Sequence, residues 1–385
     1  MRRSLYTPDH EAFRASFRQF LDREAVPHTQ RWEDTGLVDR SFFEAAGRNG
    51  FLGFEAPEEF GGLAIEDFRY NAIMSEEVVA SGTAGDGFTL GNDILAPYLI
   101  NLTTPEQRKR WLPGFTAGTT IPAIAMTEPT TGSDLAAVRT TARREGDQYV
   151  VDGAKTFITN GVQADLVLVL ARTGERDGRG LSLIAVEGGT PGFSKGNGLH
   201  KIGRKAQDTA ELFFDHCRVP VDNLIGEPGC GMRTVLTNLP RERLSMAVIA
   251  VASAERALAL AVSHCRDRTS FGVPLGSHQA LRFELAEMHT ELGVARVFVD
   301  RCVQGLLDGE LTAEDAAGAK FWTTDLQCSV IDRCLQLFGG YGYMEEYPIA
   351  RMWRDARVQR IYGGTNEIMK EIVGRAVVAA RVSER

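Results

Sequence analysis

The spacing of apolar residues changes twice along this chain, and no other feature restricts its possible folds so strongly. Over residues 8–117 apolar side chains recur every three or four positions, as Phe13, Phe17 and Leu21 do, which predicts amphipathic helices. Over residues 121–226 the pattern changes to short β-branched or alternating runs such as KTFIT, DLVLVLA and AELFF, separated by Gly-Asp, Asp-Gly and Pro-Gly steps. Such runs predict a small, largely antiparallel β domain with hairpin turns.

The helical spacing then returns and continues toward the C-terminal end. A stripe of apolar residues that includes Leu281, Met288 and Val299 predicts one long helix, and a second is predicted over residues 313–338. Long helices joined by short connections form bundles. We therefore predict a mainly α protein with a central β domain, divided into an N-terminal helical domain (1–120), a middle β domain (121–226) and a C-terminal helical bundle (227–385).

Charge and composition exclude several classes of function. A net charge of -8 without a basic stripe argues against a nucleic-acid partner, because phosphate binding requires clustered positive charge. The longest apolar run, residues 244–254, is shorter than the ~20 residues of a membrane span. The N-terminal segment lacks the apolar stretch of a signal peptide, so we expect a cytoplasmic protein. The cysteines form no Cys-x-x-Cys pair and the histidines are scattered, which predicts reduced thiols and no bound metal.

Five stretches of the sequence carry a specific resemblance. In chain order they are AMTEPTTGSD (125–134), KTFITNG (155–161), RTSFG (268–272), QLFGGYGY (336–343) and RDARVQRIYGGTNEIMKE (354–371). With this order and spacing, the chain resembles the acyl-CoA dehydrogenase family over nearly its whole length. The resemblance implies a C-terminal four-helix bundle, FAD in each subunit, and a homotetramer built as a dimer of dimers. It also implies that an acyl-CoA thioester is converted to a trans-2-enoyl-CoA, with an electron-transfer flavoprotein as the acceptor.

The resemblance assigns flavin contacts residue by residue, and some of these residues are expected to reach the flavin of a neighbouring subunit. Read locally, TEPTTGSD could instead be a polar turn, Phe157 a core residue, Arg268 a helix-end cation and the Gly339-Gly340 step a helix stop. The cofactor-binding residues that the resemblance implies are Met126, Thr127, Ser133, Phe157, Ile158, Thr159, Arg268, Phe271, Gln279, Gln336, Gly339, Gly340, Thr365 and Glu367.

The catalytic base is a separate question, because short- and medium-chain members of the family carry their glutamate at the position of Gly363. Isovaleryl and long-chain members instead place it in a Glu-Arg pair on an earlier helix, and NLPRERLSMA supplies that pair as Glu242 and Arg243. The chain therefore resembles the long-chain and isovaleryl branch, with Glu242 as the base. Pro240 fits the first turn of the helix that carries it.

The chemistry requires a desolvated carboxylate, whose pKa is raised toward the working pH, to remove a weakly acidic α proton. Glu242 could instead be one surface carboxylate in a charge run, and Glu367 is the rival base. Gly363 can still serve the reaction, through a backbone N–H directed at the thioester oxygen. The residues expected to contact the substrate are Ser133, Arg243, Tyr362, Gly363 and Gly364.

Three alternatives keep the fold and change the function. The chain could be an acyl-CoA oxidase, a dehydrogenase of a carrier-protein thioester, or a non-catalytic flavin-binding subunit. Oxidases usually carry an added C-terminal domain, and the sequence ends soon after IVGRAVVAARVSER. The presence of Glu242 argues against a non-catalytic role. The length and branching of the acyl chain depend on dispersed pocket residues that no motif identifies.

Overall fold

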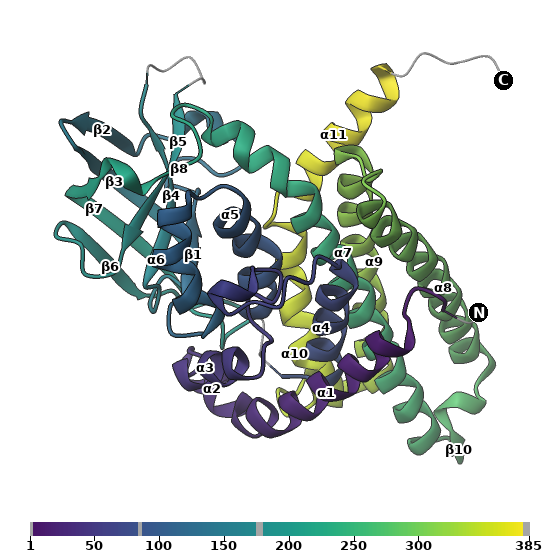
Figure 1. Ribbon diagram of the computed structural model, residues 1–385. Coiled ribbons are helices and arrows are strands. Elements are labelled where there is room, and N and C mark those ends of the chain that lie inside the picture. The colour runs from purple at the N-terminus through teal and green to yellow at the C-terminus, as the bar shows by residue number, and fades with distance from the viewer. Residues whose placement is uncertain (1–2, 84–86, 175–179, 380–385) are drawn as a thin grey trace.

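The computed structural model describes residues 3–83, 87–174 and 180–379. The outer ends of the predicted first and last domains, residues 1–2 and 380–385, lie outside these ranges. A β-sheet occupies one side of the molecule and long helices fill the other, with further helices beneath both (Figure 1). The predicted fold class, mainly α with a central sheet, is confirmed.

The N-terminal region consists of helices whose apolar faces share one aromatic cluster. Phe17, Phe20 and Trp32 are almost fully buried in it, as the spacing of three and four residues predicts. Thr7 and Thr104 cap their helices, each followed directly by a proline that suits the first turn. The helices are α1 (Pro8–Glu24), α2 (Thr29–Thr35), α3 (Arg40–Arg48), α4 (Phe68–Ser81), the π-helix η3 (Thr89–Leu95), α5 (Ala96–Asn101) and α6 (Pro105–Thr116).

The middle region is a mostly antiparallel sheet, in which only the β1–β4 and β2–β4 pairs are parallel among the described strands. In β4, Leu168 faces a cluster shared with α5 and α6, whereas Val167 and Val169 face a second cluster within the β region. Both faces of β4 are therefore buried, which explains its continuous apolar run. The strands are β1 (Pro122–Ala125), β2 (Thr141–Glu145), β3 (Gln148–Thr159), β4 (Leu166–Arg172), β5 (Leu181–Glu187), β6 (Phe193–Gly198), β7 (Thr209–Pro220) and β8 (Leu224–Ile225).

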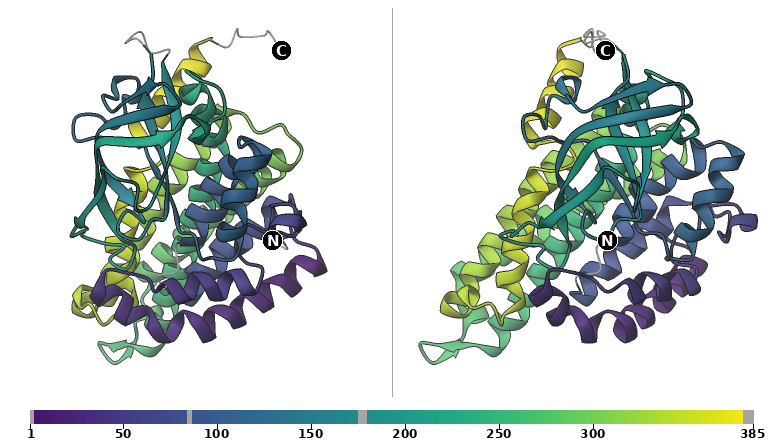
Figure 2. Two further views of the ribbon diagram at one scale, coloured as in Figure 1. Left: turned by 60° about the vertical axis from the view of Figure 1, so that its left-hand side comes forward. Right: turned by 90° about the vertical axis from the view of Figure 1, so that its left-hand side faces the viewer.

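Long helices of the C-terminal region pack side by side (Figure 2). The second of the two predicted helices is confirmed at residues 313–338, and the apolar stripe of the first lies on its inner side, with Met288, Leu292 and Val299 buried. A small β-ribbon of β9 (Thr269–Ser270) and β10 (Val273–Pro274) joins the first two helices of the region. The helices are α7 (Gly231–Asp267), α8 (Gln279–Leu307), α9 (Ala313–Phe338), α10 (Pro348–Ala356) and α11 (Asn366–Ala379).

The predicted start of the helix that carries Glu242 is wrong. Helix α7 begins at Gly231, so Pro240 lies in its interior, where it lacks the N–H that would bond to the preceding turn. Every residue from Glu242 to Ala254 is buried, so packing on α4, α8 and α9 stabilises the helix through the proline. By length and composition α7 could also cross a membrane, the one such helix in the described ranges, but 72% of its most apolar window is buried within the protein.

Candidate active site

Glu242 lies at the beginning of the fully buried part of α7, with 7% of its surface exposed. Burial raises the pKa of this carboxyl to about 7, although the Tyr98 hydroxyl and the positive charge of Arg243 act in the opposite direction. The alternative that Glu242 is a surface carboxylate is therefore wrong. A carboxylate in this environment can be ionised near neutral pH and still be a much stronger base than an exposed one.

Arg243 is also buried, with 5% exposure, and its Nε has no hydrogen-bond partner among the described residues. Burial lowers the pKa of this guanidinium, and the neighbouring Glu242 partly offsets the effect. A buried guanidinium nitrogen without a partner is destabilising unless a ligand accepts its hydrogen bond. Arg243 therefore offers a donor next to the candidate base.

The loop at Gly363 approaches the same face of α7. Gly363 has a φ of +62°, a conformation that residues with a side chain rarely adopt. A Cβ at this position would overlap the sulfur of Met246, which follows Glu242 by one helical turn and is 8% exposed. Met246 thus lies where a side chain at residue 363 would begin, and although this flexible side chain could shift, the local backbone conformation favours glycine.

A buried lysine holds this loop in place. Lys320 of α9 is fully buried, and its Nζ donates to the carbonyl oxygen of Gly364 at 2.7 Å and to Oδ1 of Asn366 at 2.9 Å. Burial, together with the charge of Arg243, lowers the pKa of Lys320 to about 8. The sequence analysis missed Lys320. Its signal is a lysine spaced four residues from Ala316 and Thr324, on the buried face of a helix.

Glu367, the rival base, lies in the first turn of α11 and is exposed. A hydrogen bond from its own backbone N–H, helped by Thr365 and two nearby cations, lowers the pKa of this carboxyl. An exposed carboxylate with a lowered pKa is a weak base. Its environment is therefore the opposite of that around Glu242.

The motifs at residues 125–134 and 155–161 lie side by side. The Thr156 N–H donates to the Thr127 carbonyl at 3.0 Å. The fully buried Lys155 donates to the Met126 carbonyl and to Oε1 of Glu128, both at 2.9 Å. This buried lysine and glutamate connect the two segments that are expected to contact the flavin, and the sequence analysis did not assign a role to either.

Phe157 projects from this junction and is 68% exposed, so the alternative that it is a core residue is wrong. It has a φ of +60° and lies where the pairing of β3 with β7 shifts register, between Lys155 and Ile158. A bulge at this point turns the aromatic ring out of the sheet. Ser133 is exposed, Met126, Thr127, Thr159 and Thr365 are partly buried, and Ile158 is buried, which leaves its backbone as the available contact.

The remaining cofactor candidates lie far from the β-sheet, at the end of the helical bundle that carries the β9–β10 ribbon (Figures 1 and 2). Phe271 in the ribbon is 95% exposed with a φ of +52°, and Gln279 begins α8, also exposed. An open groove of about 670 Å³ beside them is lined in part by Arg268, Gln336, Gly339 and Gly340. The structure therefore separates the predicted cofactor residues of the sheet from those at this end of the bundle.

Comparison with known proteins gives a consistent result over the whole described chain. Three domains of the acyl-CoA dehydrogenase family match in order: the N-terminal domain over residues 7–119, the middle domain over 123–217 and the C-terminal domain over 229–378. The chain belongs to the acyl-CoA dehydrogenase family. The long-chain specific acyl-CoA dehydrogenase of Mus musculus mitochondria is 45% identical over 381 residues, covering 98% of this chain and 88% of that protein.

Solved structures of acyl-CoA dehydrogenases agree with the fold. An acyl-CoA dehydrogenase from Geobacillus kaustophilus has a TM-score of 0.95 and 45% identity, covering 97% of this chain and 98% of that one. A glutaryl-CoA dehydrogenase from Mycobacterium smegmatis in complex with FADH2 has a TM-score of 0.86 and 25% identity, covering 99% and 97%. The resemblance to this family and to its long-chain members is confirmed, and members of the family are flavin-dependent oxidoreductases.

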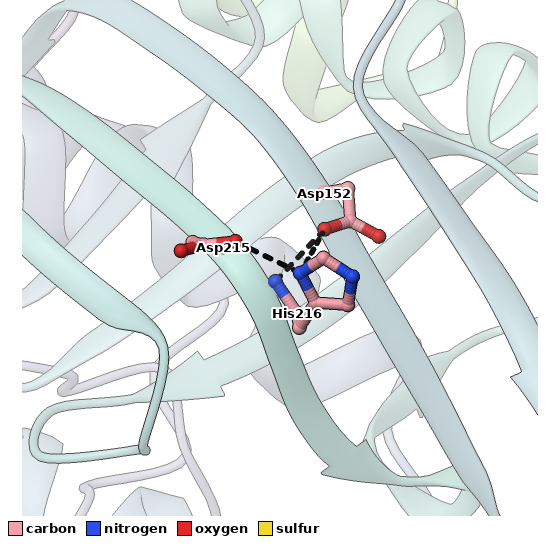
Figure 3. A group of neighbouring side chains, drawn as sticks. All are labelled: Asp152, Asp215 and His216. Atoms are coloured by element: carbon pink, nitrogen blue, oxygen red, sulfur yellow. Dashed lines mark hydrogen bonds and ion pairs between the residues drawn. The ribbon is translucent and has the colours of Figure 1, made fainter.

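Among the described residues of this acyl-CoA dehydrogenase, one group could hold a metal by composition: Asp152, Asp215 and His216 (Figure 3). It lies at a second register shift between β3 and β7, where the His216 N–H donates to Oδ1 of Asp152 at 2.8 Å. The His216 ring contacts Asp215 at 2.8 Å, and Asp152 also pairs with Arg143. These contacts explain the group as support for a bulge, and the absence of a metal stays a prediction.

Proposed function

We propose that this protein oxidises an acyl-CoA thioester to a trans-2-enoyl-CoA, with FAD as cofactor and Glu242 as the base. The observation that carries the proposal is the contrast between the two positions, 242 and 363, at which members of this family hold the base. Glu242 is buried with a pKa raised to about 7, and the other position for a base in this family is a glycine whose side-chain space Met246 occupies. Glu242 is therefore better suited to proton abstraction than Glu367, which is exposed and has a lowered pKa.

Glu242 takes the α proton of the acyl group, and the electron pair of the broken C–H bond passes toward the thioester carbonyl. The Gly363 N–H, which donates no backbone hydrogen bond among the described residues, is suited to stabilise the resulting negative charge on oxygen. Lys320 fixes the loop that presents this donor. Arg243, Ser133, Tyr362 and Gly364 are proposed to contact the rest of the substrate.

The residues fit a flat, anionic cofactor. Phe157 exposes an aromatic ring next in the chain to Thr156, whose N–H bonds to the Thr127 carbonyl, and the glycine-containing segment that ends at Ser133 allows close approach. Arg268 supplies a cation suited to a pyrophosphate, at the groove lined by Gly339 and Gly340. FAD, when bound, supplies the acceptor for the β hydride of the substrate.

The separation of these two groups supports a proposal about assembly. We infer that Arg268, Phe271, Gln279 and the segment 336–340 complete the FAD site of a partner subunit, within a homotetramer that is a dimer of dimers. Phe271 is nearly fully exposed, and α8 also exposes Phe283, Val294 and Val297. Apolar side chains gathered in this way are typical of an association surface.

Anaerobic mixing of the FAD-loaded protein with a panel of saturated acyl-CoAs tests the proposal. We expect the flavin absorbance to bleach with at least one chain length. Bleaching by a carrier-protein thioester, with none by any acyl-CoA, would identify the biosynthetic alternative. Rapid reoxidation by oxygen, with none by an electron-transfer flavoprotein, would identify an oxidase. A flavin that no thioester reduces would contradict the proposal.

A further inference from the structure

Tyr98, which lies outside α7, is a hydrogen-bond partner of Glu242. It lies in α5, which follows the π-helix η3 without a break, and the neighbouring Pro97 occupies the first turn of α5. The Tyr98 side chain is fully buried, and its hydroxyl donates to Oε1 of Glu242 at 3.3 Å. Among the described residues, it is the one hydrogen-bond donor to this carboxylate.

The hydroxyl can act only as a donor toward Glu242. Burial and the charge of Glu242 raise the pKa of Tyr98 far above the working range, so the phenol keeps its proton throughout. Asn238, one turn before Glu242, acts on the titration of the same hydroxyl, and its buried Nδ2 has no hydrogen-bond partner in the described ranges. Asn238 and Glu242 of α7 therefore lie near the Tyr98 hydroxyl from the same helix, one turn apart.

Charged groups on the elements packed against α7, and on the loop beyond them, have other partners or are exposed. Asp93, in η3, is 2% exposed, accepts from Asn71 at 2.7 Å and lies near Arg241. On α9, Lys320 binds the loop at Gly364, and beyond the loop Glu367 is exposed. Arg243, on the same helix as Glu242, is the one cation that acts on its titration. No second hydrogen bond in the described ranges orients the Glu242 carboxylate.

We propose that Tyr98 is a positioning residue for the base: it fixes Oε1 of Glu242 and leaves Oε2 to take the α proton of the substrate. This inference rests on the proposed role of Glu242. The hydrogen bond to Oε1 persists when Oε2 is protonated, because a carboxylic acid keeps its carbonyl oxygen as an acceptor. Tyr98 thus orients the carboxyl in both states without exchanging a proton.

Replacing Tyr98 with phenylalanine tests the inference, because it removes the donor and keeps the ring. A hydrogen bond to the ionised form favours that form, so its loss should move the titration of Glu242 upward by up to about one pH unit. The rate of anaerobic flavin reduction at pH 6 should then fall by up to ~10-fold relative to the rate at pH 9. Tyr149→Phe, at another buried tyrosine on β3, is the matched control and should leave the pH profile unchanged.

A second measurement does not depend on turnover. The infrared band of the protonated Glu242 carboxyl, assigned by its loss in Glu242→Gln, should titrate at a higher pH in Tyr98→Phe than in the parent protein. A rate that falls equally at every pH, with an unmoved infrared titration, would assign Tyr98 a packing role and overturn the inference. Full flavin reduction by Glu242→Gln would instead overturn the proposed base, whatever Tyr98→Phe shows.

Discussion

The two ends of the helical bundle differ in how complete their sites are. Around Glu242, the carboxylate, its donor Tyr98 and the loop at Gly363 are brought together by one chain, and the base is buried before any ligand arrives. Around Arg268, the side chains expected to bind FAD are exposed and line an open groove. The first region is formed by the folding of one chain, whereas the second presents exposed residues.

This difference follows from what each residue must do. A base for a weak carbon acid requires desolvation, which the core of a subunit supplies. A dinucleotide presents charge along an extended length, and surface residues of two subunits can share its contacts. We therefore expect changes near Glu242 to alter chemistry within an intact protein, and changes near Arg268 to alter cofactor retention and assembly.

The largest expected effect is that of Glu242→Gln. It keeps the size of the side chain and removes the basic oxygen, so FAD content and folding should persist while flavin reduction falls by at least ~10²-fold. Stopped-flow absorbance under anaerobic conditions measures the rate. Glu367→Gln is the comparison, and its FAD-loaded fraction should lose far less. A rate of flavin reduction equal to that of the parent protein would show that Glu242 is not the base, and Glu367 would then be the next candidate.

The second prediction concerns the open end. Arg268→Ala should weaken FAD binding by ~10–100-fold, the loss expected for a hydrogen bond to a charged group. The residues around Glu242 should be unaffected. In the variant molecules that retain FAD, substrate should therefore reduce the flavin at the same rate as in the parent protein. Arg301→Ala, at an exposed arginine on α8, is the control.

Light scattering tests the assembly that this prediction assumes. We expect a homotetramer, or at minimum a dimer, and weaker association when Phe271 is also replaced by alanine. A monomer that holds FAD tightly would show that the groove at Arg268 is complete without a partner.

Much of the fold and of the two sites can be predicted from the sequence, because the spacing of apolar residues and the order of the motifs are read from it directly. The helical, β and helical regions and the helix over residues 313–338 follow from the spacing of apolar residues, whereas the candidate base Glu242 follows from the resemblance to the family's long-chain and isovaleryl branch. Tyr98 and Met246 do not, because their roles depend on how α5 and α7 pack and on where the 363 loop meets α7. Pro240 misled the prediction for the same reason: tertiary packing keeps α7 continuous across a residue that usually starts or breaks a helix.

The third prediction moves the base to the loop. In a Glu242→Gly background, Gly363→Glu should restore little activity alone, because Met246 occupies the required space and a φ of +62° disfavours a side chain. Adding Met246→Ala should open that space and recover about tenfold in flavin reduction over Glu242→Gly. Recovery should stay partial, since base placement tolerates little error. Equal activity with and without Met246→Ala would show that Met246 does not block the position.

The smallest expected effect is on the free energy of unfolding. It measures how far the buried, ionised carboxylate of Glu242 destabilises the fold. The folded pKa of Glu242 is raised to about 7 from an ordinary value of 4.5, so its ionisation destabilises the fold as pH rises between these values. The penalty is nearly absent below pH 4.5 and reaches about 3 kcal/mol by pH 8. Glu242→Gln should therefore be more stable than the parent at pH 8, by a Tm of a few degrees, with a smaller gain at pH 5. The exposed Glu59→Gln should show no such pH-dependent gain. A gain of equal size at both pH values would mean that the carboxyl is neutral throughout, and Glu242 would then be unsuited to act as the base.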